Sequence, residues 1–155
     1  PIKNNKYQHM KKVVVVVTLC LVFLGCQPKV EKESVTLLTG YWEIEKVVFE
    51  EGEDKEYPSN DSFDYFEIKG DTGFRKKVMP QLDGTFQAND LVETIRIREK
   101  DDQIFLDFKT DFAQWSEELV RIDAKELVLR NAEQKEYHYK KTGPIKIIDN
   151  GKTTK

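Results

Sequence analysis

Apolar and polar side chains alternate along most of the chain after residue 37. Ile95 and Ile97, for example, have polar neighbours on both sides. A period of two places the apolar side chains on one face of a β-strand. The pattern slips in phase between Leu119 and Ile122, a break that is typical of a β-bulge. The alternation predicts nine strands, at residues 42–50, 62–69, 73–79, 85–88, 91–99, 102–109, 114–122, 126–131 and 136–141.

Short polar connections separate these strands. Most contain Gly, Asp or Asn, as at residues 69–73, 83–84 and 131–134. Such connections join antiparallel neighbours as hairpins, because parallel strands need crossovers of a dozen residues or more. A sheet of this many strands with one apolar face must pack on another sheet or close on itself. We therefore expect an all-β fold, an antiparallel up-and-down meander that forms a small barrel of eight or nine strands.

The N-terminal residues have the pattern of an export signal. A basic pair, Lys11-Lys12, precedes twelve mostly apolar residues at 13–24, which is too few to span a membrane of ~30 Å. Met10 is a suitable initiator for this signal, so residues 1–9 are interpreted as an upstream extension. We therefore assign residues 10–25 to a signal peptide.

The junction Gly25-Cys26, after Phe23-Leu24, resembles the bacterial lipobox. The resemblance implies that a lipid is attached to Cys26, which then becomes the first residue and holds the protein on the membrane. The alternative is that Cys26 ends an uncleaved anchor. Residues 26–36 are polar and lack periodicity, so we expect a flexible tether. Gln27 in place of an Asp favours delivery to the outer membrane, with the periplasmic and surface faces left open.

Composition excludes several functions. The leader carries four lysines and no acid, so its removal leaves 28 acids against 21 bases, a net charge of −7 that repels nucleic acid. Cys20 and Cys26 are the only cysteines, and His138 is the only histidine after the leader. A zinc site and a histidine-dependent hydrolytic triad are therefore not expected. We predict no cofactor and no enzymatic activity, although paired carboxylates are too numerous to test from sequence alone.

Gly40-Tyr-Trp42 at the first strand resembles the Gly-x-Trp opening of lipocalins and of small lipocalin-like lipoproteins of the Bacteroidetes. In that family the tryptophan closes the barrel floor beneath a basic side chain from a late strand. The resemblance covers residues 37–141 and implies a lipocalin-like barrel in which Arg130 lies over Trp42. Residues 142–155 are then a C-terminal tail, in which 143–148 could add a short strand.

Aromatic residues recur on nearly every predicted strand, and most are expected to form the core. A barrel of this size can also hold one small ligand, so the same side chains are candidates for a pocket lining. We expect a small apolar or amphipathic ligand; the alternative is an envelope protein-interaction module or inhibitor that binds through loops or a sheet edge. A filled interior would favour the alternative. The candidate ligand-binding residues are Tyr65, Phe74, Lys76, Phe108, Trp115 and Tyr139.

Lipidation of Cys26 gives a direct prediction. Replacing Cys26 with Ser removes the thiol to which the lipid is attached, so metabolic labelling with palmitate should disappear and the precursor should remain unprocessed. Labelling and processing are followed by gel electrophoresis, with Cys20→Ser as the matched control. Labelling that survives in Cys26→Ser would contradict the assignment.

Overall fold

The computed structural model describes residues 29–88, 90–143, 146–147 and 153–154. All nine predicted strands are present, with ends shifted by two residues or fewer, and β2 is an additional short strand. The elements are η1, a 3-10 helix (Lys32–Leu38), and the strands β1 (Gly40–Val48), β2 (Lys55–Glu56), β3 (Phe63–Lys69), β4 (Thr72–Pro80), β5 (Phe86–Ala88), β6 (Glu93–Lys100), β7 (Gln103–Lys109), β8 (Gln114–Ile122), β9 (Glu126–Arg130), β10 (Glu136–Thr142), β11 (Lys146–Ile147) and β12 (Thr153–Thr154).

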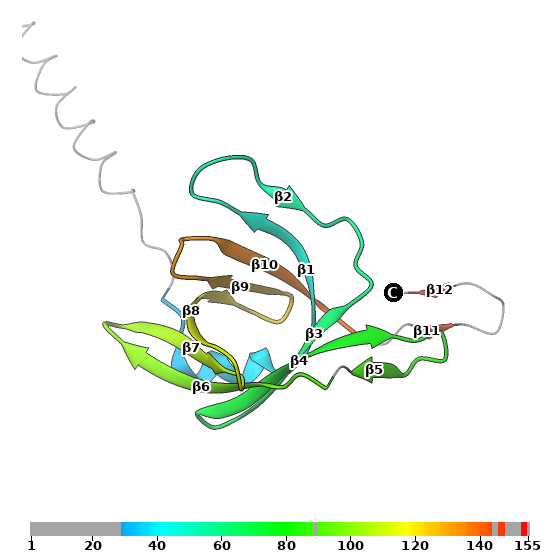
Figure 1. Cartoon of the computed structure of the whole chain (residues 1–155), viewed down its shortest axis with the longest axis horizontal. Coiled ribbons are helices and arrows are strands. Elements are labelled where there is room, and N and C mark those ends of the chain that lie inside the picture. Colours follow the sequence, from blue (N-terminus) through cyan, green and yellow to red (C-terminus); the bar gives the residue numbers. More distant parts are fainter. Residues whose placement is uncertain (1–28, 89, 144–145, 148–152, 155) are drawn as a thin grey trace, which may run out of the picture.

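Eight strands form a closed antiparallel barrel, which appears as a ring in Figure 1. The order around the ring is β1, β3, β4, β6, β7, β8, β9 and β10, and β10 pairs back onto β1. Two short strands lie outside the ring, because β2 pairs only with β1 and β5 only with β4. The up-and-down, lipocalin-like barrel predicted from the sequence is therefore confirmed. In the expected C-terminal tail, β11 and β12 pair as a small separate hairpin.

The phase slip in the sequence has its counterpart in β8. The pairing of β8 with β9 shifts between Leu119 and Arg121, so Val120 is the extra residue of a β-bulge. A second irregularity lies in β1 between Ile44 and Lys46. Each bulge restores the apolar side chains to the inner face after the break, so the interior stays continuous across both strands.

The two ends of the barrel differ in how they are built. We call the end with the β3–β4, β6–β7 and β8–β9 turns the floor, and the opposite end, with the connections 49–62, 81–92, 110–113 and 131–135, the mouth. The interior from the floor to the middle of the barrel is filled by apolar side chains that are almost inaccessible to solvent. They include Leu38, Trp42, Phe66, Ile95, Ile97, Ile104, Leu106, Phe108, Leu119, Leu127 and Leu129.

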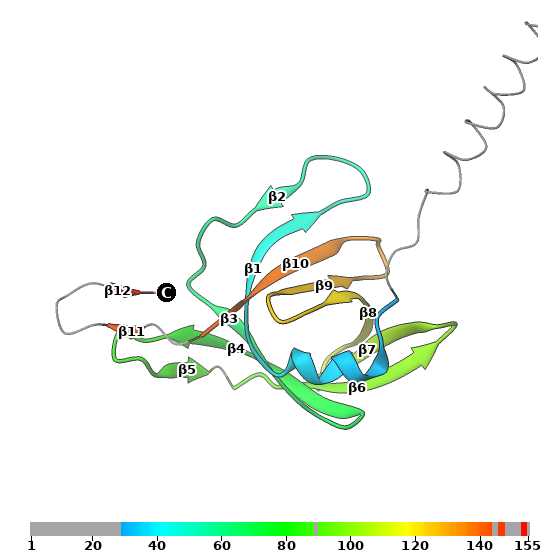
Figure 2. The ribbon, with the colours of Figure 1, turned by 180° about the vertical axis from the view of Figure 1, so that it is seen from behind.

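The helix η1 lies across the floor, as Figure 2 shows in front of the ring. Val35 and Leu38 of η1 are buried in the barrel core. This corrects the expectation of a flexible tether at 26–36, because the segment is ordered from Lys32 onward by these two apolar side chains. Lys32 pairs with Asp71 at 3.3 Å in the β3–β4 turn. Residues 26–28 lie outside the described residues.

Trp42 and Lys141 fasten η1 to the barrel. The indole Nε1 of Trp42 donates a hydrogen bond to the carbonyl of Leu38 at 2.7 Å. The Lys141 ammonium lies 4.2 Å from the centre of the Trp42 ring and donates to the carbonyls of Leu37 and Thr39, at 2.8 and 2.7 Å. Partial burial lowers the pKa of Lys141. The cation over Trp42 is therefore that of Lys141, and the assignment of Arg130 to this position is wrong.

Gly40 is required by the same arrangement. Its φ of +129° lies where other residues are strained, and a Cβ there would lie 2.9 Å from Lys141 Nζ. A side chain at this position would displace the ammonium from the two carbonyls. Gly40, Trp42 and Lys141 thus act as one unit, which we call the floor clasp.

The floor clasp predicts a selective loss of stability. Lys141→Met retains the aliphatic stem but removes two hydrogen bonds and the cation over Trp42, so the free energy of unfolding should fall by about 1–3 kcal/mol. Lys100→Met, at an exposed floor position, should change it by less than about 0.5 kcal/mol. Urea unfolding measures both variants, and equal effects would show that the clasp does not stabilise the floor.

Candidate functional site

Three charged side chains point into the barrel near its mouth. Residues paired across an antiparallel ladder share one face, and Arg75 is paired with both buried Phe66 and Glu93. Glu117 is likewise paired with buried Leu106. Arg75, Glu93 and Glu117 therefore face inward from β4, β6 and β8, and we call them the interior charge cluster.

Arg75 is held by a carboxylate and an aromatic ring. Its guanidinium forms a close ion pair with Glu93 and lies 4.3 Å from the centre of the Phe108 ring. Only 12% of the Arg75 side chain is exposed. A buried cation needs such partners, because desolvation of an unpaired charge costs several kcal/mol. The ion pair with Glu93 therefore offsets most of the desolvation cost of the Arg75 guanidinium.

The carboxylate of Glu117 has a hydrogen-bond donor on only one of its two oxygens. Its Oε1 accepts a hydrogen bond from Trp115 Nε1 at 3.0 Å, whereas its Oε2 is buried with no donor within hydrogen-bond distance in the described residues. The nearest cation is Arg75 Nη1, 3.7 Å from that oxygen. Burial raises the pKa of Glu117, and the nearby Arg75 only partly opposes this. The mouth therefore contains a buried carboxyl oxygen that lacks a partner.

Trp115 connects Glu117 to the aromatic part of the interior. Its ring stacks on Phe108, with centroids 5.2 Å apart and planes 10° from parallel. Trp115 is only half-buried, and it precedes Glu117 on β8 on the mouth side. Arg75, Phe108 and Trp115 thus form one continuous stack beside the unpartnered oxygen. This arrangement offers an apolar face and a polar acceptor next to each other.

Two further polar side chains complete the interior of the barrel. Asp64 of β3 is buried and pairs with Lys77 of β4 at 2.9 Å, while Lys77 itself is half-exposed. The phenol of Tyr139 is buried, and this burial raises its pKa well above the usual range. Tyr139 therefore stays neutral in the physiological pH range.

The structure separates the predicted ligand-binding residues into two groups. Phe108, Trp115 and Tyr139 face the interior. Tyr65, Phe74 and Lys76 lie on the outer wall, because the inward positions of β4 are taken by Arg75 and Lys77.

The prediction that Lys76 points into the barrel is therefore wrong. Aromatic contacts on the outer wall explain why. The ring of Tyr65 lies 6.1 Å from that of Phe74 and 4.8 Å from that of Tyr41. Tyr41 in turn stacks on Phe86 of β5 at 4.2 Å. Phe74, the one aromatic residue of β4, thus has an aromatic partner on the outer wall, so the apolar face of this strand does not identify the inner one.

The interior charge cluster is not predicted from the sequence. For Glu117 a signal was present, because it lies two residues after Trp115 and two before Leu119 and so shares their face. For Arg75 no comparable signal existed, since its strand is apolar on the opposite face. Charged residues are assigned to solvent by default, and the three residues of the interior charge cluster are exceptions.

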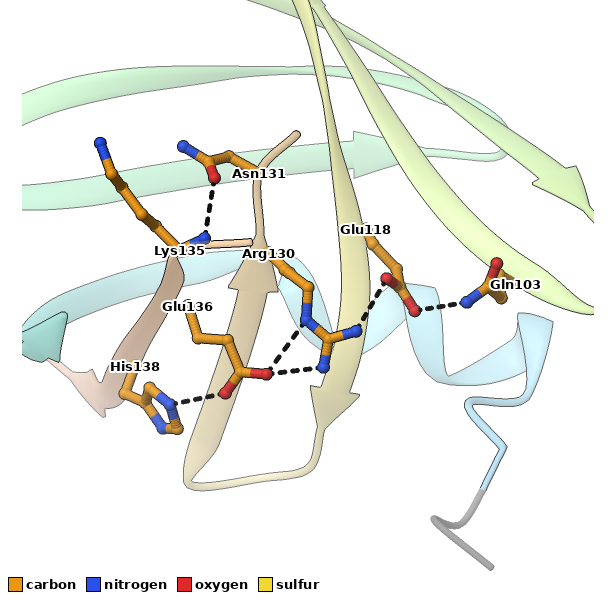
Figure 3. A network of polar contacts seen from close by, with 7 residues as sticks. All are labelled: Gln103, Glu118, Arg130, Asn131, Lys135, Glu136 and His138. Atoms are coloured by element: carbon orange, nitrogen blue, oxygen red, sulfur yellow. Dashed lines mark hydrogen bonds and ion pairs between the residues drawn. The ribbon is translucent and has the colours of Figure 1, made fainter. Parts of the chain in front are cut away.

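Arg130 belongs to a network on the outer wall, shown in Figure 3. Its guanidinium pairs with Glu118 at 3.2 Å and with Glu136 at 2.6 Å. The network continues to Gln103 through Glu118 and to His138 through Glu136. It links β7, β8, β9 and β10 across the outside of the barrel, so we interpret it as a structural element of the wall.

A hollow of about 930 Å³ lies elsewhere, between residues 29–34 and strands β8, β9, β10 and β1. Its lining includes outward-facing Arg121, Val128 and His138, and it does not include Arg75, Glu93 or Glu117. The described part of the chain holds no group of three His, Cys, Asp or Glu residues that fits a metal ion. Within the same residues, no helix is long and apolar enough to cross a membrane.

The raised pKa of Glu117 predicts a pH-dependent difference in stability. The folded state binds this proton more tightly than the unfolded state, so wild-type stability falls as pH rises above the ordinary Glu value of ~4.3. Glu117→Gln cannot ionise, so its free energy of unfolding should rise relative to that of wild type between pH 4 and pH 7.

Urea unfolding at the two pH values measures the difference between variant and wild type. Glu118 follows Glu117 on β8, and its side chain faces the outer wall. Glu118→Gln should show no such gain, because this substitution removes the ion pair with Arg130. A Glu117→Gln difference that is independent of pH would mean that Glu117 ionises as it does in water.

The chain is similar to several solved structures at low sequence identity. An uncharacterized protein from Bacteroides eggerthii DSM 20697 is 12% identical, with a TM-score of 0.44 over 68% of this chain and 99% of its own. A lipocalin-like protein from Bacteroides uniformis ATCC 8492 is 11% identical, with a TM-score of 0.43 over 68% and 99%. Apocrustacyanin C2 is 8% identical, with a TM-score of 0.44 over 77% and 68%. No curated protein matches the chain.

The family assignment rests on the sequence of the barrel. Residues 38–129 match the family described as the lipocalin-like domain. The match spans β1 to β9 and covers more than half of the 155 residues. The chain therefore belongs to the lipocalin-like domain family.

Proposed function

We propose that this chain is a lipid-anchored binding protein of the bacterial cell envelope, which holds a small amphipathic molecule in the mouth of its barrel. The lipocalin-like fold is typical of binding proteins rather than of enzymes. The observation that carries the proposal is Glu117, a buried carboxylate with one unpartnered oxygen beside the half-buried ring of Trp115. An apolar surface next to an unsatisfied polar group is what a ligand site requires.

The filled floor limits where a ligand can bind. Trp42, Leu106 and Leu127 are inaccessible to solvent, so the lower interior is already occupied by the chain's own side chains. The mouth is different, because Trp115 and Tyr137 keep part of their surface accessible there. A ligand would therefore bind near the opening and would not be enclosed in a deep cavity. This position favours a molecule with a small polar head and an apolar part.

The anchor is proposed from the sequence, through the lipobox resemblance at Cys26. Cys26 lies three residues before Lys29, whose ammonium pairs with Asp102 of the β6–β7 turn at 2.8 Å. That turn belongs to the floor, so the tethered end of the barrel is its floor end. In this arrangement the mouth is remote from the anchored end and open to ligands from the aqueous phase.

A second candidate function is the binding of another envelope protein. Phe112 is 88% exposed and Leu82 is 77% exposed, and both lie on mouth connections. Large apolar side chains at such exposure are suited to a contact with a protein surface. These side chains could equally contact the apolar part of a ligand held in the mouth. An experiment is therefore needed to distinguish ligand binding from protein binding.

Tryptophan fluorescence separates the two candidates. The chain has two tryptophans, so Trp42→Phe leaves only Trp115 at the mouth and Trp115→Phe leaves only Trp42 at the floor. Titration with a panel of single-chain amphiphiles should give a saturable change in Trp42→Phe and none in Trp115→Phe. Circular dichroism confirms that both variants keep the β fold. No saturable change with any amphiphile would exclude the ligand site and favour a protein partner.

A further inference from the structure

We propose that the molecule bound in the mouth is a cationic amphiphile, whose protonated amine donates a hydrogen bond to Oε2 of Glu117. This inference rests on the proposed function and specifies the ligand class of the same site. It depends on three independent features: the unmet hydrogen bond of Glu117, the balance of charges inside the mouth, and the composition of the surrounding connections.

The first feature is the type of partner that is missing. Glu117 Oε2 is an acceptor without a donor, while its Oε1 is satisfied by Trp115. Arg75 is already held by Glu93, and it lies 3.7 Å from Oε2, beyond hydrogen-bond distance. The interior therefore needs a donor and does not need another acceptor. A ligand carboxylate or phosphate would bring a second anion to an anion that is already incompletely paired.

The second feature is the excess of negative charge inside the mouth. Two cations face three carboxylates here: Asp64 pairs with Lys77, while Glu93 and Glu117 both lie within ion-pair distance of Arg75. Glu117 is the third carboxylate, and its side chain is only 9% exposed. A monovalent cation would balance this remaining charge. Its N–H donor would also complete the hydrogen bonding of the carboxylate. A hydrogen bond between charged groups is stronger than one between neutral groups.

The third feature is the acidity of the connections around the mouth. The connections 49–62, 81–92, 110–113 and 131–135 hold ten acidic residues and two lysines. An opening lined by one sign of charge raises the local concentration of the opposite ion and speeds its association. The acidic residues are Glu50, Glu51, Glu53, Asp54, Glu56, Asp61, Asp83, Asp90, Asp111 and Glu133.

Apolar side chains in the same region account for the apolar part of the ligand. Leu82, Leu91 and Phe112 are exposed on two of these connections, 81–92 and 110–113, between the acidic residues. The half-buried ring of Trp115 lies between this rim and Glu117 along β8. An alkyl chain could therefore extend from Glu117 past the indole toward the rim. The aromatic face also attracts a cation directly, at ~0.5–2 kcal/mol.

The test uses three probes that share one alkyl chain: octylammonium, octanoate and octanol. The full chain, in phosphatidylcholine nanodiscs at pH 7, is titrated while the indole N–H signals are followed by nitrogen-15 NMR. The Trp115 N–H donates to Glu117, so an amine on the other oxygen should shift this signal. The Trp42 N–H donates to Leu38 at the floor and reports an intact fold.

Octylammonium should shift the Trp115 signal saturably and bind at least ~10-fold more tightly than octanoate or octanol. Glu117→Gln should lose this preference by ~10-fold or more with the Trp42 signal unchanged. Glu118→Gln, on the outer face of the same strand, should bind as the wild type does. The comparison of the three probes on the wild type tests the preference for an amine even if no variant can be measured.

Two results would overturn the inference, and they differ in what else they exclude. Binding of octanoate or octanol as tightly as octylammonium, with no effect of Glu117→Gln, would refute the amine and leave a ligand site in the mouth. No saturable shift of the Trp115 signal with any of the three probes would refute both the amine and the proposed function.

Discussion

The pairing of β10 with β1 is the contact on which the rest of the structure depends. It closes the sheet, so every strand of the ring acquires an inner and an outer face, and no ring edge is left to pair with another chain. Closure also brings Lys141, near the end of the last ring strand, over Trp42 near the start of the first. The barrel is therefore closed and its floor fastened at the same place.

Stability and the candidate site lie at opposite ends of this closed barrel. The floor is filled by buried apolar side chains, and η1 covers it. The mouth encloses the ion pair of Arg75 with Glu93 and buries Glu117, where apolar side chains of similar size would pack at a lower desolvation cost. Proteins tolerate such local conflicts mainly where function requires them. The contrast between the two ends is the physical basis for proposing a ligand site at the mouth.

The sequence predicted the strands well, because β-strand periodicity and turn residues are local signals. The bulge after Leu119 could be found for the same reason. The inward face of β4 could not, since Phe74 has an aromatic partner on the outer wall that comes from another strand. Lys141 over Trp42 and the ordering of Val35 are contacts between distant parts of the chain. Such contacts depend on which residues the closed barrel brings together, and the alternation of residues does not specify these pairs.

The central claim is that a ligand contacts Glu117 in the mouth of the barrel, and a crystal structure of the protein purified from the cells that make it tests this most directly. The account predicts density for a small molecule with a donor atom within about 3 Å of Glu117 Oε2 and an apolar part against Trp115. A bound molecule located only on the outer wall, with the mouth closed by the chain's own side chains, would contradict the account.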